Sequence, residues 1–254
     1  MNETSLVSDK NLYDKNIANI ENIVNKLSRK ATLMQICDFI ENDNIYSSWF
    51  GKVLLSLPNE KWPTSNGEPM DPLCQINVTQ LPYIPEELKD IEFITIFIDP
   101  NELPINNRNG ENWLLRAYKK INDLVPLEQV NTSSQIIPHP IIGQLIEEDY
   151  PSFDDYLNLK ENDKEIYLPK QVEDEFDDCF KNVAGIKFGG WPTLLQSEIY
   201  WGPGNQHPIK PQFVFQINSI PKCNFYWGDD GVGYFGRGTV DENRDEWVIE
   251  WQCW

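Results

Sequence analysis

Basic side chains are scarce in this sequence. Its 254 residues include 21 Lys and Arg against 40 Asp and Glu, which gives a formal net charge of −19. Nucleic acids and anionic lipid surfaces are bound mainly through Lys and Arg, so neither is an expected partner. No apolar run approaches the ~18 residues of a membrane-spanning helix. The composition therefore argues against nucleic-acid and membrane partners.

Residues that usually support catalysis or metal binding are also few. There are only two histidines, His139 and His207, each followed by proline, and no G-x-S-x-G motif for a serine nucleophile. The five cysteines are widely spaced and include no CxxC pair, which excludes a zinc ribbon. The N-terminus is polar and shows no apolar signal region, so free thiols in the cytoplasm are expected. We expect no cofactor, no metal and no identifiable catalytic residue, which favours a binding role over catalysis.

Glycine and proline are absent from the first 50 residues, while all 14 glycines and 18 prolines follow. Apolar residues recur at helical spacing over 14–44, which predicts an N-terminal helical segment. The frequent glycines and prolines after residue 50 are typical of short strands and structured loops. Strands are expected over 91–98, rich in β-branched and aromatic residues, and over 212–217 and 247–253, which alternate with period two.

Similar elements recur in the same order in the two halves of the chain. Trp-Pro, a strand with Gln-Ile-Asn, an aromatic strand and a Trp-initiated strand are found in each, and residues 147–178 between them carry a net charge of −10. The expected fold class is α+β, a β-rich internal duplication of two similar antiparallel-sheet units about a pseudo-twofold, with N-terminal helices. The expected parts are a helical segment at 1–46, a first β repeat at 47–125, an acidic connector at 126–182 and a second β repeat at 183–254.

Four motifs of the second half resemble the YwqG-like family. Residues 185–196, Gly-Ile-Lys-Phe-Gly-Gly-Trp-Pro-Thr-Leu-Leu-Gln, are similar to its K-x-G-G-x-P-x-x-x-Q signature, and residues 227–235, Trp-Gly-Asp-Asp-Gly-Val-Gly-Tyr-Phe, to its W-G-D-x-G-x-x-Y-F motif. Residues 213–217 resemble its L-x-x-Q-I strand, and the ending 251–254 its W-x-C type. The first half has Leu-Leu-Ser-Leu-Pro at 54–58 where the family often has a G-G-x-P turn. The resemblance implies a duplicated, β-rich α+β domain without an established biochemical activity.

The candidate ligand- or partner-binding residues come from these motifs. The paired carboxylates of the Gly-Asp-Asp-Gly loop could bind a ligand, although the loop equally suits a tight turn. The aromatic and amide side chains could line a groove, since tryptophan is enriched at recognition sites. The candidates are Gln75, Trp191, Gln196, Gln216, Trp227, Asp229 and Asp230.

Two functions remain open from the sequence. One is a non-catalytic protein-binding module whose acidic surface captures a basic partner, for instance as an antagonist or immunity-type protein against a basic effector. The other is a small-ligand-binding protein or enzyme with a site where the two repeats meet. The sequence selects neither the partner nor the ligand.

Overall fold

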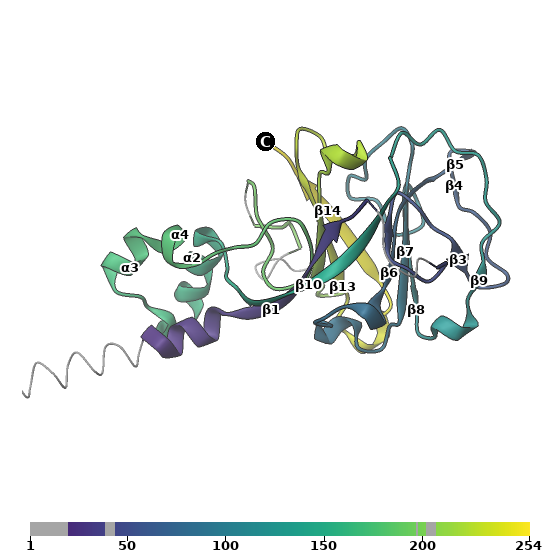
Figure 1. The fold of residues 1–254 in the computed structure, drawn as a ribbon. Helices are drawn as coiled ribbons and strands as arrows, with labels where there is room; N and C mark the ends of the chain where they lie inside the picture. The colour runs from purple at the N-terminus through teal and green to yellow at the C-terminus, as the bar shows by residue number, and fades with distance from the viewer. Residues whose placement is uncertain (1–19, 39–43, 197, 202–206) are drawn as a thin grey trace, which may run out of the picture.

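The computed structural model describes residues 20–38, 44–196, 198–201 and 207–254 (Figure 1). Its centre is one antiparallel sheet of ten strands. From one edge to the other the order is β14 (Trp247–Gln252), β13 (Val232–Arg237), β12 (Gln212–Asn218), β11 (Ile186–Gly189), β1 (Arg29–Ile36), β10 (His139–Asp149), β2 (Trp49–Phe50), β6 (Asp71–Asn77), β7 (Phe93–Ile98) and β8 (Trp113–Tyr118).

The sheet curls until it nearly closes on itself. Contacts between residues near its two edges show this closure. The ring of Trp113 in β8 lies 6.1 Å from that of Phe235 in β13. The indole of Trp251 in β14 donates a hydrogen bond to the carbonyl of Pro104 at 2.8 Å. The main hydrophobic core fills the interior, with side chains from both edges and from the middle of the sheet.

The remaining strands are short pairs and the helices are few. β3 (Leu55–Ser56) pairs with β9 (Val125–Pro126), and β4 (Thr64–Ser65) pairs with β5 (Glu68–Pro69). The short 3-10 helices are η1 (Val78–Gln80), η2 (Glu86–Leu88), η3 (Ile121–Asp123), η4 (Lys164–Ile166), η5 (Pro221–Cys223) and η6 (Asp241–Asn243). None of the described helices has both the length and the apolar character needed to cross a lipid bilayer.

Three α-helices form a separate lobe beside the sheet. They are α2 (Phe153–Asn162), α3 (Lys170–Asp174) and α4 (Phe176–Cys179), and they pack near the N-terminal helix at 20–27 (Figure 1). The helical lobe, as we call residues 20–27 and 150–180, has its own small core, which includes Ile23, Tyr156 and Phe176. Ser152 caps α2 by accepting a hydrogen bond from the Asp155 amide at 3.2 Å.

The expected α+β class with two packed units is wrong. The protein is mostly β, and its strands form one continuous sheet. β1 and β10 pair with each other in the middle of that sheet, β1 pairs onward with β11, and β10 pairs onward with β2. This central pair joins the strands on either side, so a duplication into two units is not shown. β10 also lies inside the segment expected to be an acidic connector.

The expected helix over 14–44 differs from the structure in its second part. Helix is present at 20–27, whereas Arg29–Ile36 form β1; residues 14–19 and 39–43 lie outside the described part. The spacing of Leu33 and Ile36 fits a helix, but β1 gains backbone hydrogen bonds from neighbours on both sides. Such pairing overrides a weak local preference. The expected strands at 91–98, 212–217 and 247–253 correspond to β7, β12 and β14.

Candidate functional site

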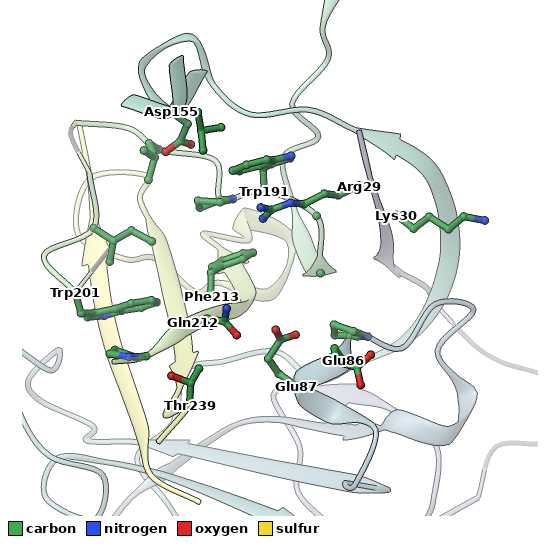
Figure 2. A pocket seen from close by; sticks show the side chains of 18 of the residues that line it. Arg29, Lys30, Glu86, Glu87, Asp155, Trp191, Trp201, Gln212, Phe213 and Thr239 are labelled. Carbon is green, nitrogen blue, oxygen red and sulfur yellow. The ribbon is translucent and has the colours of Figure 1, made fainter. Parts of the chain in front are cut away.

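A cavity of about 780 Å³ lies where the sheet, the helical lobe and the loop before η2 meet (Figure 2). Its volume is in the range that binds small organic ligands. The walls come from Ser28 to Lys30 at the start of β1, the loop from Tyr83 to Glu87, α2, the turn after β11, and the first residues of β12. The lining combines aromatic rings with charges of both signs.

The wall after β11 is built on a buried ion pair. The Lys187 ammonium lies 2.9 Å from the Asp149 carboxylate, and both side chains have no exposed surface. The same carboxylate accepts hydrogen bonds from the backbone amides of Val183 and Trp191, both at 2.7 Å. Several strong donors thus satisfy the buried charge and determine the path of the chain into Trp191.

The two glycines between Lys187 and Trp191 allow this close approach. Gly189 and Gly190 both adopt positive φ, +75° and +67°. A Cβ on Gly190 would lie 2.3 Å from the Asp149 carboxylate, and one on Gly189 would lie 2.8 Å from the Tyr83 ring. The glycines of the Lys-x-Gly-Gly-Trp-Pro sequence therefore let the backbone pack against the buried Asp149 carboxylate. This packing places Trp191 at the cavity wall.

Trp191 supports Arg29, an arginine for which the described residues provide no hydrogen-bond acceptor. Its indole N–H donates to the carbonyl of Leu27 at 2.7 Å, which sets the orientation of the ring. The Arg29 guanidinium lies 3.3 Å from the ring centroid, a close cation–π stack. Within the described part of the chain, this guanidinium donates no hydrogen bond and has no carboxylate within 4.0 Å. Arg29 is exposed, and its side chain lines the cavity (Figure 2).

Acidic side chains face Arg29 across the cavity. Burial raises the pKa of the Asp155 carboxyl to about 6, and the negative charge of Glu198 adds to the effect, while the Ser152 hydrogen bonds and Arg29 oppose it. Glu87 projects toward the centre of the cavity, on the side opposite Trp191 (Figure 2). Asp155 and Glu87 are the largest electrostatic partners of Arg29, although neither lies within ion-pair distance. A carboxyl that titrates near neutral pH inside a cavity is typical of a functional site.

The backbone that carries Glu87 is held from two sides. Thr32 in β1 accepts a hydrogen bond from the Tyr83 amide and donates one to the Tyr83 carbonyl, at 2.9 and 2.8 Å. Arg237, which is 2% exposed, donates to the Glu87 carbonyl and pairs with Asp90 through both terminal nitrogens. These contacts place Glu87 without using its carboxylate, which leaves that group available to the cavity.

Of the seven residues predicted from sequence, only Trp191 lines this cavity. Gln75 and Gln216 are fully buried and hold the backbone. The Gln75 amide accepts from Leu54 and donates to the carbonyls of Ile45 and Ser47. The Gln216 amide accepts from Thr193, and it donates to Gly185, to the hydroxyl of Thr193 and to Asn218. These amides are occupied within the protein.

The other predicted residues lie away from the cavity. Gln196 is exposed and donates to the carbonyl of Cys253 at 2.6 Å, and Trp227 is completely buried in the core. Asp229 and Asp230 are exposed in a turn before β13, where Gly228 and Asp230 both have positive φ. That turn lies at the opposite ends of β12 and β13 from the cavity, roughly 20 Å along the strands. No group of three or more His, Cys, Asp or Glu side chains in the described residues is arranged to hold a metal ion.

The sequence reasoning missed Arg29, Glu87 and Asp155. The sequence predicts a helix around Arg29 and a solvent-exposed acidic connector around Asp155, and no motif marks the loop that contains Glu87. No spacing rule connects residues this far apart in the chain. A small signal was present in Ser152 and Asp155, whose spacing suits the first turn of a helix.

The raised pKa of Asp155 predicts a pH-dependent stability. The folded carboxyl titrates near 6 and the unfolded one near 3.8, so the folded state binds more protons in between. Stability should therefore fall as the pH rises through this window. Asp155→Asn should raise the free energy of unfolding by about 2 kcal/mol at pH 7.5 and leave it unchanged at pH 4, allowing for cavity water that screens the charge. Urea unfolding at both pH values tests this.

Asp154→Asn is the matched control, because Asp154 lies in the same first turn of α2 and is exposed. Its effect should be small and alike at the two pH values. Arg29, Glu198, Ser152, Lys187 and Tyr234 also interact electrostatically with Asp155 and remain unchanged in both variants. An Asp155→Asn effect that is the same at pH 4 and pH 7.5 would contradict the assignment.

The structure thus defines a mostly β protein with a mixed-charge cavity beside a helical lobe. A comparison with protein families gives a match to a domain of unknown function, DUF1963, over residues 50–253, and the chain belongs to this family. A search of curated proteins gave no match. β1 and the N-terminal helix precede the matched region, whereas Trp191, Glu87 and Asp155 lie within it.

Proposed function

We propose that this protein binds a small molecule in the cavity, with Arg29 as the anchor for an anionic group of the ligand. The supporting observation is the Arg29 guanidinium, which is stacked on Trp191 and has no hydrogen-bond acceptor among the described residues. A guanidinium offers five N–H donors in a planar fork that matches a carboxylate or phosphate. Stacking on an immobilised indole reduces the entropy lost when such a ligand binds.

The experiment is a thermal-shift screen of the purified chain against small carboxylic, phosphoric and sulfonic acids, after native mass spectrometry for a retained molecule. A hit should raise the melting temperature of the wild-type protein. Arg29→Gln should weaken its binding by about 10- to 100-fold, because charge-assisted hydrogen bonds are lost.

Lys30→Gln is the control for Arg29→Gln. Lys30 is the next residue, and it points away from the cavity and pairs with Glu147 at 2.7 Å (Figure 2). This variant removes the same charge and should bind as the wild type does. Equal binding by Arg29→Gln, or no hit with any acid, would overturn the proposed function.

A protein-binding role is the second candidate, and the helical lobe favours it. The lobe projects from the sheet (Figure 1). It exposes carboxylates on α2, α3 and α4 and between the last two, among them Asp154, Glu161, Asp174, Glu175, Asp177 and Asp178. Its described lysine pairs neutralise only part of this charge, through Lys26 with Glu165 and Lys160 with Glu173. Such a surface would attract a basic protein, and an antagonist of a basic effector is one form of that role.

Capture of partners from the native lysate at low and raised salt tests the second candidate. A basic protein should bind at low salt, leave at high salt, and bind less to a variant with Glu175→Gln, Asp177→Asn and Asp178→Asn. A variant with Asp229→Asn and Asp230→Asn removes exposed charge elsewhere and should bind normally. Salt-independent capture, or equal loss in both variants, would contradict this role.

The finer family name is part of the proposal. The motifs at 185–196 and 227–235 support a YwqG-like assignment for this chain within its family of unknown function. Their roles here are to build the Trp191 wall and the turn before β13.

A further inference from the structure

We infer that the ligand is a zwitterion of the α-amino-acid or short-peptide class, with its carboxylate on Arg29, its ammonium group toward Glu87 and Asp155, and an apolar side chain against the aromatic wall. This inference rests on the proposed function and adds the ligand class to it. Three features of the cavity support it: the separation of opposite charges, the excess of acidic groups, and the aromatic residues between them.

The opposite charges in the cavity are separated. Arg29 interacts electrostatically with Asp155 and Glu87, yet neither carboxylate lies within 4.0 Å of the guanidinium. In Figure 2, Arg29 and Glu87 approach the open space from opposite sides, with Asp155 at a third side. A ligand between them can pair with both signs at once, which direct ion pairing within the protein would prevent.

The acidic excess selects against simple anions. Glu87, Asp155 and Glu198 line the cavity, against Arg29, Lys30 and Lys210; Glu86 also lies at its rim but is exposed and paired with Lys89. Lys30 is paired outside the cavity, and Lys210 is exposed to solvent. A phosphate dianion on Arg29 would be repelled by the carboxylates facing it. A ligand that carries an ammonium group beside its carboxylate turns the same carboxylates into partners.

Aromatic side chains supply the apolar part of the site. Trp201 and Phe213 stand on the wall beside the open space (Figure 2), and the Tyr83 ring packs near Gly189. Such rings bind apolar side chains, and the faces of their π-systems also attract an ammonium group. A volume of about 780 Å³ exceeds what a small amino acid fills, which favours a bulky side chain or a dipeptide.

The test is a competition screen with the full chain and a pooled library of the common amino acids and their dipeptides, followed by calorimetry on the best member. Its N-acetyl derivative removes the ammonium group, and its C-terminal amide removes the carboxylate. Each derivative should bind the wild type at least 10-fold more weakly. Glu87→Gln should lose most of the preference for the free amine and keep the preference for the free carboxylate, whereas Arg29→Gln should show the reverse pattern.

Glu86→Gln is the matched control, since Glu86 is exposed and pairs with Lys89. It should keep both preferences. Equal binding of the free and N-acetyl forms would overturn the zwitterion inference and leave the proposed function standing. No binding by any library member would also overturn the inference, and if the acid screen is negative as well, the proposed function fails with it.

Discussion

Replacing Asp149 by asparagine is expected to lower the free energy of unfolding by about 3 to 5 kcal/mol. The substitution keeps the shape of the side chain but removes the charge that neutralises Lys187. Both partners are completely buried, and burial already lowers the pKa of the Lys187 ammonium below its ordinary value. Without Asp149, this ammonium group must remain as an unpaired buried charge or lose its proton, and both cost stability. Urea unfolding followed by tryptophan fluorescence measures the loss.

Two companion variants separate this effect from a general loss of acidic charge. Glu147→Gln breaks the exposed pair with Lys30, only two residues away, and should change stability by less than about 1 kcal/mol. Adding Lys187→Met to Asp149→Asn removes the stranded charge and should recover part of the loss. If Asp149→Asn costs no more than Glu147→Gln, the buried pair does not have the structural role assigned to it.

Gly190→Ala is expected to destabilise the fold by about 4 kcal/mol. About 1 to 2 kcal/mol comes from a φ of +67°, which an L-residue with a Cβ adopts only with strain. The remainder comes from the position of the new Cβ, which would lie 2.3 Å from the Asp149 carboxylate and 3.1 Å from the Ala31 side chain. The carboxylate cannot move away without breaking its contacts to Lys187, Val183 and Trp191.

Gly67→Ala isolates the backbone contribution. Gly67 also has a positive φ, +86°, but a Cβ there would meet nothing within 4 Å. This variant should lose only the 1 to 2 kcal/mol of backbone strain. The difference between the two variants in urea unfolding then measures the clash with Asp149. Equal losses would show that the carboxylate can move at little cost.

Both large effects act on the same support of the cavity. Asp149 binds the Trp191 amide, and Gly190 lets the chain reach it, so either change should also displace the ring on which Arg29 stacks. Substitutions near Asp149 and Gly190 that destabilise the fold only slightly should therefore reduce ligand binding while the protein stays folded.

The sequence was most informative where local pattern and tertiary environment agree. Phe93–Ile98 is apolar on both faces, and it forms a fully buried strand inside the sheet. The glycine-rich motif at 187–191 also contains Trp191, which lines the cavity, and its part in ligand binding stays a prediction. The helical spacing over 29–36 misled because β1 is stabilised by partners more than 100 residues away in the chain.

By itself, the sequence determined the acidic charge, the buried strands and a glycine-rich turn that ends in Trp191. These follow from composition and short-range pattern. Only the tertiary structure decided that the strands form one nearly closed sheet, and that Arg29 faces Asp155 and Glu87. Those residues belong to β1, α2 and η2, which are far apart in the chain. Their association depends on strand pairing and helix packing, and no local sequence pattern encodes such long-range contacts.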